Sequence, residues 1–196
     1  CHEHLEYYSF KSINRILNNN GLKVYKHQFF DINGGTSRYF ICHQDNFKLI
    51  DKSVNNIKNL EYQNKVNSIH TMNVFFRKVK FLKKKTRNLL NSLKKKSKII
   101  YGYGSSKKGN MILQYFNINE NDIDFIAERN TEKFNKYTPI SNIKIISEKQ
   151  SRKLKPDYYF VLPWHFKRGI LKREEKSLKK KIKFIFPLPK LHVYSK

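Results

Sequence analysis

Several kinds of residue are scarce in this 196-residue chain, and each scarcity excludes a class of protein. Its two cysteines, Cys1 and Cys42, permit at most one disulfide and exclude a cysteine-rich metal site. Such sparing use of cysteine fits a reducing compartment, so we expect a cytoplasmic protein. No apolar run reaches the roughly 18 residues that a membrane-spanning helix needs. Because the chain opens on Cys1, with no signal-like segment after it, we expect the natural start of the protein to lie upstream.

Acidic residues are scarce as well: 15 Asp and Glu stand against 41 Lys and Arg, which leaves a net charge of +26. An excess of this size is typical of proteins that bind nucleic acids or anionic membranes. Base composition is a second explanation, because Lys, Asn and Ile, which have AT-rich codons, are abundant. The cations are mostly Lys, which is poorer than Arg at bidentate base recognition. We therefore expect nucleic-acid binding to be non-specific at most, and a basic nucleic-acid-binding α/β domain is the alternative function.

The sequence pattern of residues 1–45 predicts one helix followed by a β-hairpin. Apolar residues at helical spacing favour a helix over residues 5–18. Residues 22–30 and 37–43 are typical of strands, and the turn residues Gly34 and Gly35 lie between them.

A helical connector is expected over residues 46–97. Its apolar residues step by three, four or seven, as on one face of a long helix. Eleven basic residues lie from Arg77 to Lys98, and no acidic residue occurs between Glu61 and Glu120. Such a helix either lies on RNA or a membrane surface, or is the solvated outer side of a packed helix.

Residues 98–196 alternate strand-like and helix-like segments. The strand-like segments begin near residues 98, 123, 143, 156 and 182, and a Lys-rich helix is expected over residues 165–181. Alternation of this kind predicts right-handed βαβ units and a mainly parallel, Rossmann-like α/β domain.

The segment from Gly102 to Asn110 follows a strand and opens a helix, where backbone N–H groups and the helix dipole can hold a phosphate. Lys107 and Lys108 add positive charge. The glycine spacing is GxGxxxxG, which departs from the dinucleotide fingerprint GxGxxG, and Asn110 stands where a Walker motif has Lys. Either this loop binds an anion or it is a tight turn between strand and helix.

Two other polar stretches are candidate sites. His2-Glu3-His4 precedes the first helix, and His4 is a candidate base, although a lone histidine is more often structural than catalytic. Trp164 and His165 follow an apolar strand, at the edge of an open α/β sheet where ligands bind. Trp164 either stacks on a ligand ring or closes the end of the sheet.

Six segments, in this order, resemble one family, the sugar C-methyltransferases that act on nucleotide-linked 4-keto-6-deoxy sugars. The matching segments are HEHLEYYS at 2–9, GGTSR at 34–38, GYGSSKKGN at 102–110, ERNTEKFNKYTP at 128–139, PDYYFVLPWHF at 156–166 and KFIFPLP at 183–189.

The resemblance implies that this chain is the C-terminal part of such an enzyme. Residues 1–45 would end a class I methyltransferase Rossmann domain that binds S-adenosylmethionine, and residues 98–196 would be the C-terminal Rossmann-like domain. Most of the S-adenosylmethionine site and an N-terminal zinc module would lie upstream, with no metal site in this chain. We therefore expect the chain alone to be inactive.

The resemblance also implies site residues. Glu3 and His4 match a Tyr-x-Glu-His element with catalytic roles, although Cys1 stands where the family has Tyr and His165 where Asn is usual. The implied reaction removes a proton beside the sugar ketone and transfers a methyl group to the resulting enolate. The nucleotide-sugar substrate would contact Gly34, Gly35, Arg38, Gly104, Ser105, Lys108, Gly109, Asn110, Trp164 and His165.

Overall fold

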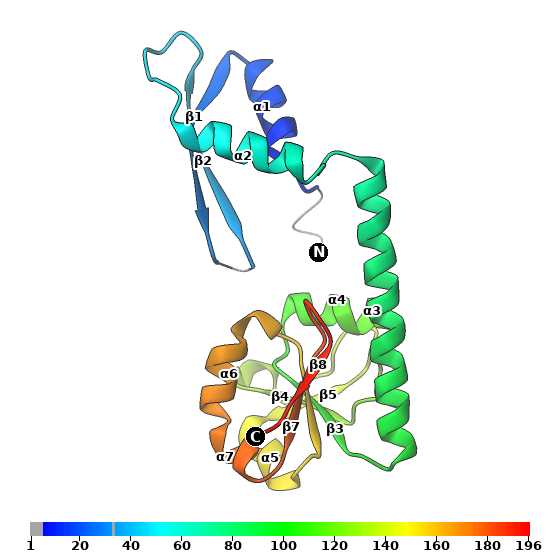
Figure 1. The fold of residues 1–196 in the computed structure, drawn as a ribbon. Coiled ribbons are helices and arrows are strands. Elements are labelled where there is room, and N and C mark those ends of the chain that lie inside the picture. Colours follow the sequence, from blue (N-terminus) through cyan, green and yellow to red (C-terminus); the bar gives the residue numbers. More distant parts are fainter. Residues whose placement is uncertain (1–5, 33) are drawn as a thin grey trace. The chain divides into compact units, whose positions relative to one another are not determined.

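The computed structural model describes residues 6–32 and 34–196, and the chain divides into two compact units between Arg77 and Lys78 (Figure 1). The N-terminal unit contains α1 (Phe10–Asn18), β1 (Leu22–Phe30), β2 (Thr36–His43) and α2 (Lys52–Gln63). Helix α3 (Ile69–Lys95) begins in this unit and ends in the C-terminal one.

The helix expected over residues 5–18 begins at Phe10, because Ser9 caps it. The Ser9 side chain accepts a hydrogen bond from the Ser12 N–H at 3.2 Å, which satisfies one of the unpaired groups at the start of α1. Strands β1 and β2 pair antiparallel, as the sequence predicts. Gly35 has a φ of +119° in their turn, and a Cβ atom there would lie 2.9 Å from the Phe29 ring.

The N-terminal unit has a small core. Only three of its described apolar side chains are buried, namely Phe10, Val24 and Val54. Both α1 and α2 pack on β1. A two-stranded hairpin is marginal alone, so the two helices supply most of its cover.

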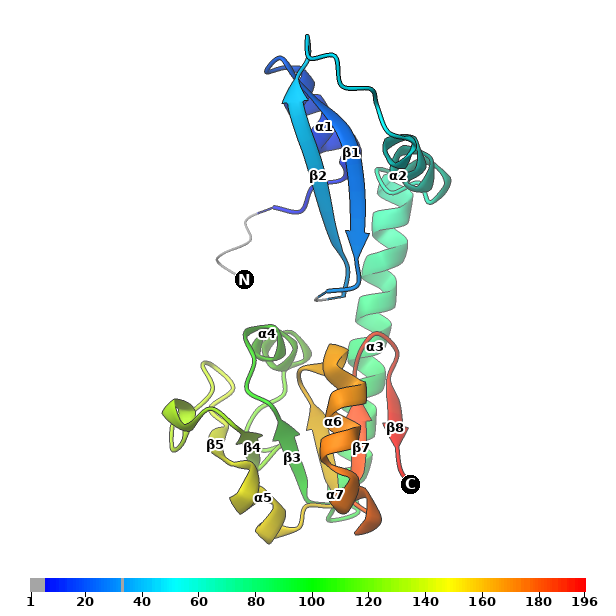
Figure 2. The same ribbon diagram turned by 90° about the vertical axis from the view of Figure 1, so that its left-hand side faces the viewer.

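The C-terminal unit is built on one six-stranded sheet in the order β5-β4-β3-β6-β7-β8 (Figure 2). Within this sheet, β3, β4, β5, β6 and β7 run parallel, and the last strand, β8, is antiparallel. Their bounds are β3 Ile100–Tyr103, β4 Phe125–Glu128, β5 Lys144–Ser147, β6 Tyr158–Val161, β7 Lys183–Phe186 and β8 His192–Tyr194. A mainly parallel α/β sheet is thus confirmed.

Helices cover both faces of this sheet, with α3 on one side and α6 and α7 on the other (Figure 1). The helices after α3 are α4 (Lys107–Phe116), α5 (Glu148–Leu154), α6 (Lys167–Arg173) and α7 (Glu175–Lys179). Leu90 and Leu93 of α3 pack with α4 on a face rich in isoleucine. The opposite face is aromatic, and Tyr103 packs there edge-on against Tyr159.

The prediction of a single helix over residues 165–181 is wrong, because the chain turns at Glu174 and forms two helices, α6 and α7. The Glu174 carboxylate is 1% exposed and accepts hydrogen bonds from Arg152, Tyr103 and Ser177. Burial alone would raise the pKa of Glu174, but these hydrogen bonds hold it below its usual value. This buried polar cluster fixes the turn.

The expected division at residues 1–45, 46–97 and 98–196 stays a prediction. Within residues 46–97 the apolar stripe corresponds to α3, and α2 precedes it as a separate helix. The positive-φ residue Lys65 lies in the turn between them.

Candidate functional site

The carboxyl ends of β3 and β6 form the topological switch point of the C-terminal sheet. From β3 the chain first adds β4 and β5 on one side and then crosses to add β6 and β7 on the other. Loops that leave adjacent strands in opposite directions open a crevice, and open α/β sheets bind ligands there. Two stretches identified from the sequence, 102–110 and 162–166, follow these two strands.

Glycines bring these two stretches into direct contact. Gly104 has a φ of +80°, and a Cβ atom there would lie 2.7 Å from Cγ of Pro163. A Cβ atom on Gly109 would lie 2.6 Å from Cβ of Leu162. Both distances are shorter than any relaxed carbon contact, so only glycine allows the β3–α4 loop to reach the end of β6.

The backbone N–H groups of this loop are partly used by the protein itself. The Ser106 side chain caps α4 by accepting from Gly109 N–H at 3.0 Å, and Ser105 N–H donates to the Glu128 carboxylate at 2.7 Å. Lys133 Nζ donates to the Ser105 carbonyl at 2.6 Å. A phosphate would therefore find the N–H groups of Ser105 and Gly109 already paired.

Glu128 ends β4 where a dinucleotide-binding domain has its ribose-binding acid. One of its carboxylate oxygens accepts from Ser105, and the other accepts from the N–H groups of Arg129 and Asn130 at 2.6 and 3.0 Å. Since both oxygens hold the chain's own backbone, the carboxylate does not suit ribose binding.

Asn110, on the first turns of α4, presents an unpaired acceptor. Its side-chain oxygen is buried and has no hydrogen-bond partner among the described residues. Among the buried side-chain polar atoms of those residues, the Thr86 hydroxyl alone also lacks a partner. A buried polar atom without a partner costs about 1–3 kcal/mol. The amide of Asn110 is thus suited to a donor group that a ligand supplies.

A short 3₁₀ helix, Trp164–Phe166, follows β6 and contains both Trp164 and His165. Trp164 is half-buried and packs against the apolar clusters on both faces of the sheet, so it closes the end of the sheet. The His165 ring lies 4.3 Å from the Phe166 ring. Burial lowers the pKa of His165, and the positive charge of Lys108 lowers it further. His165 is therefore neutral at pH 7, with one ring nitrogen able to accept a hydrogen bond.

The remaining candidate residues belong to the N-terminal unit. Gly34, Gly35 and Arg38 lie at the exposed end of the β1–β2 hairpin, where the Arg38 guanidinium lies 4.7 Å from the Phe30 ring centre. Glu3 and His4 lie outside the described residues. The roles of all five stay predictions.

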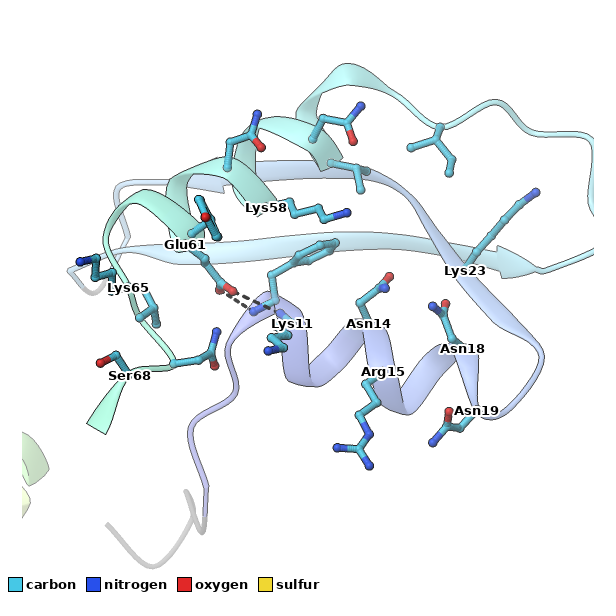
Figure 3. Close-up of a pocket in the computed structure, with 18 of the residues that line it drawn as sticks. Lys11, Asn14, Arg15, Asn18, Asn19, Lys23, Lys58, Glu61, Lys65 and Ser68 are labelled. Atoms are coloured by element: carbon cyan, nitrogen blue, oxygen red, sulfur yellow. Dashed lines mark hydrogen bonds between the residues drawn. The ribbon is translucent and has the colours of Figure 1, made fainter. Parts of the chain in front are cut away.

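A groove between α1 and α2 was not anticipated from the sequence (Figure 3). Its volume is about 1150 Å³. Its polar lining is made of the basic residues Lys11, Arg15, Lys23, Lys58 and Lys65, the asparagines Asn14, Asn18, Asn19, Asn55, Asn59 and Asn67, and Gln44, Glu61 and Ser68. Lys and Asn recur at helical spacing in both helices, and this was the signal that could have revealed the groove.

Among residues 6–32 and 34–196, no three His, Cys, Asp or Glu side chains gather closely enough to hold a metal ion. Over the same residues, no helix is both long and apolar enough to cross a membrane.

The family model described as "C-methyltransferase C-terminal domain" matches residues 31–189. The chain belongs to this family. It is also similar to the C-methyltransferase NovU of Streptomyces niveus, with 26% identity over 194 residues. That alignment covers 99% of this chain and 46% of NovU, so the chain spans less than half the length of this relative. The resemblance stated from the six segments is thereby confirmed, and both loops at the switch point lie inside the matched C-methyltransferase domain.

Proposed function

We propose that this chain is the C-terminal part of an S-adenosylmethionine-dependent C-methyltransferase. Its substrate would be a nucleotide-linked deoxysugar that is methylated on the carbon beside its ketone. The family match over residues 31–189 is the observation that carries the proposal. The similarity to a C-methyltransferase along 99% of the chain supports it.

The residues described here do not suffice to hold S-adenosylmethionine. The described residues of the N-terminal unit form a hairpin and helices, and among them no parallel strand is followed by a glycine loop. In the β3–α4 loop two N–H groups are already paired. We assign most of that site to the part of a longer protein beyond this chain. In this proposal α1, β1 and β2 end a class I methyltransferase domain whose other strands lie upstream.

The reaction needs a base beside the sugar ketone. Removal of the proton gives an enolate, whose carbon bonds to the donor's methyl carbon as the carbon–sulfur bond breaks. Glu3 and His4 are our candidates for proton transfer, on the strength of the family resemblance. Methyl transfer from a sulfonium leaves a neutral thioether, so the base and a stabiliser for the enolate oxygen are the main demands on the protein.

The switch-point loops are our candidates for contacting the substrate. Lys108 supplies positive charge, neutral His165 supplies a hydrogen-bonding ring nitrogen, and the Asn110 amide supplies an unpaired acceptor. Together they suit a ligand with a phosphate and several hydroxyl groups. Gly34, Gly35 and Arg38 are proposed as further contacts from the hairpin.

A turnover assay tests this proposal. The full-length protein is incubated with S-adenosylmethionine and a nucleotide-linked 4-keto-6-deoxy sugar, and we expect a product heavier by one CH₂ group. The matched control is this 196-residue chain alone, for which we expect no product. A folded full-length protein that methylates none of a panel of such sugars contradicts the proposal.

Helix α3 favours a second candidate function, non-specific nucleic-acid binding. Arg87, Lys94 and Lys98 form ion pairs with Asp122, Asp124 and Asp157, whereas no ion pair joins the other eight cations of residues 77–98 to a described carboxylate. We expect weak binding to any oligonucleotide that falls steeply with salt. Salt-insensitive or sequence-selective binding would contradict it.

A further inference from the structure

Lys133 reaches from the β4–β5 loop to the β3–α4 loop, where the proposed substrate contacts begin. We propose that Lys133 is a positioning residue, which together with Glu128 clamps the backbone of Ser105. The clamp fixes the start of α4 and therefore the places of Lys108 and Asn110 at the switch point. This inference rests on the proposed function and extends it to the β4–β5 loop.

The backbone that carries Lys133 is itself held in place. Lys133 ends a single 3₁₀ turn, Thr131–Lys133, after β4. The Asn130 side chain caps this turn by accepting one of its N–H groups at 3.0 Å. The N–H groups of Arg129 and Asn130 both donate to one oxygen of the Glu128 carboxylate. The start of the Lys133 side chain is therefore fixed relative to Glu128.

Both backbone polar groups of Ser105 are held by charged side chains. Lys133 Nζ donates to the Ser105 carbonyl at 2.6 Å, and the Ser105 N–H donates to Glu128 Oε2 at 2.7 Å. Lys133 Nζ lies 4.0 Å from the same Oε2 atom. Ser105 is only 7% exposed, so these charge-assisted hydrogen bonds are partly shielded from water and are stronger than bonds at an open surface. Two opposite charges thus clamp one residue of the β3–α4 loop.

The position of Ser105 decides where α4 begins. The next residue, Ser106, caps α4: its side chain accepts the N–H of Gly109 at 3.0 Å, and its carbonyl accepts the N–H of Asn110 at 3.0 Å. A displacement of Ser105 therefore moves the first turn of the helix, which carries Lys108 and Asn110. Small misplacements of groups that hold a substrate are costly, so a clamp on this loop affects substrate binding from a distance.

Direct contact between Lys133 and the substrate is the other interpretation of a cation in this place. The short bond from Lys133 Nζ to the Ser105 carbonyl argues against it, because a substrate phosphate would have to replace a charge-assisted bond inside the protein. The two interpretations make different predictions for Ser105. Only positioning makes the protection of the Ser105 N–H depend on Lys133.

Amide hydrogen exchange in the 196-residue chain, followed by NMR, tests the clamp. We expect Lys133→Met to speed the exchange of the Ser105 N–H by about 10-fold, the effect of losing one hydrogen bond to a charged group. Lys133→Arg keeps a cationic donor and should keep the exchange close to the wild-type rate. The matched control is Lys136→Met, which removes an exposed cation from the same loop and should change the rate by less than about 2-fold.

Kinetics of the full-length enzyme test the consequence for the substrate. We expect Lys133→Met to raise KM for the nucleotide-linked sugar about 10-fold, while kcat and KM for S-adenosylmethionine change by less than about 2-fold. A role confined to folding would instead lower the active fraction, which lowers kcat and leaves both KM values unchanged. Lys133→Arg should restore KM for the sugar, and Lys136→Met should leave it unchanged.

Two results would overturn the inference. Unchanged exchange of the Ser105 N–H in the Lys133→Met chain excludes the clamp, and a raised KM for the sugar beside it would make Lys133 a direct substrate contact. Faster exchange with an unchanged KM for the sugar excludes the positioning role. A wild-type enzyme that is inactive on every sugar tested contradicts the proposed function instead, and the exchange measurement on the chain alone still decides whether the clamp exists.

Discussion

The two units of this chain differ sharply in how much apolar surface they bury. The C-terminal unit buries apolar side chains on both faces of a six-stranded sheet, whereas only three of the described apolar side chains of the N-terminal unit are buried. Large apolar side chains of the N-terminal unit stay exposed, among them Phe47 at 100%, Leu49 at 90% and Tyr62 at 84%. Hydrophobic burial is the main favourable term in folding, so the comparison separates a self-sufficient domain from one that depends on a further partner.

Expressing the units apart is the most direct way to break this comparison. We expect residues 78–196 to unfold in one cooperative transition, because all of their core is internal. Residues 1–77 alone should show no cooperative melt, since three buried side chains cannot offset the entropy of ordering the unit. Circular dichroism during heating measures both, and a cooperative melt of residues 1–77 would contradict the contrast.

The buried polar cluster around Glu174 is a second source of stability that distinguishes the C-terminal unit from the N-terminal one. We expect Arg152→Ala to destabilise it by about 3 kcal/mol, because it leaves a buried carboxylate without its main cation. Urea unfolding measures this, and Lys153→Ala, an exposed neighbour on α5, is the control. A loss no larger than that of the control would mean that Tyr103 and Ser177 suffice to hold the charge.

The same cluster predicts a pH dependence. The pKa of Glu174 is lowered in the folded state, so the unfolded state binds more protons as the pH falls. Its stabilisation is therefore complete above the usual pKa of glutamate and is lost as the pH falls through the folded value. Glu174→Gln should flatten the acid limb of a plot of unfolding free energy against pH. If the substitution left the acid part of this plot unchanged, groups other than Glu174 would cause the loss of unfolding free energy at low pH.

Glycine substitutions test the contact between the switch-point loops. We expect Gly109→Ala to cost about 2 kcal/mol, because its methyl group would meet Leu162 at 2.6 Å. Gly169→Ala in α6 is the matched control, since nothing lies within 4 Å of its Cβ position. That control should stabilise the unit by up to about 1 kcal/mol through helix propensity. Similar effects of the two substitutions on the melting temperature would contradict the close packing.

The smallest effect expected is electrostatic. Lys108→Ala should raise the pKa of His165, because it removes a nearby positive charge, while burial still keeps the pKa below that of a free histidine. An NMR titration of the His165 ring follows the change, with Lys153→Ala as the control. An unchanged pKa of His165 would mean that the Lys108 charge does not lie close to this ring.

The sequence predicts best where local chemistry decides the structure. The Gly34-Gly35 turn, the strands beside it and the β3–loop–α4 segment all follow from turn residues and alternation. Helix α5 and strand β8 were not anticipated, because one is short and highly charged and the other has only three residues. The break at Glu174 depends on Arg152, 22 residues away in the chain, which no local pattern reveals.

Site prediction follows the same division. From the sequence, the segment Gly102–Asn110 and the residues Trp164 and His165 were each predicted to follow a strand, and the structure shows that the loops after these two strands are in contact. The hydrogen bond from the Ser105 N–H to the Glu128 carboxylate could not be predicted, since it depends on the register of β3 against β4. The groove was missed because it arises only when α1 and α2 pack on the same strand.

Glu128 can also be viewed as a ligand tethered to its own binding loop. A carboxylate held by the chain beside Ser105 has an effective concentration that no dilute anion in solution matches. Under the proposed function, a substrate phosphate would therefore compete poorly for this backbone group. Recognition at the switch point would then depend on side chains, and we expect substitution at Lys108, Asn110 or His165 to change selectivity while the loop itself keeps its shape.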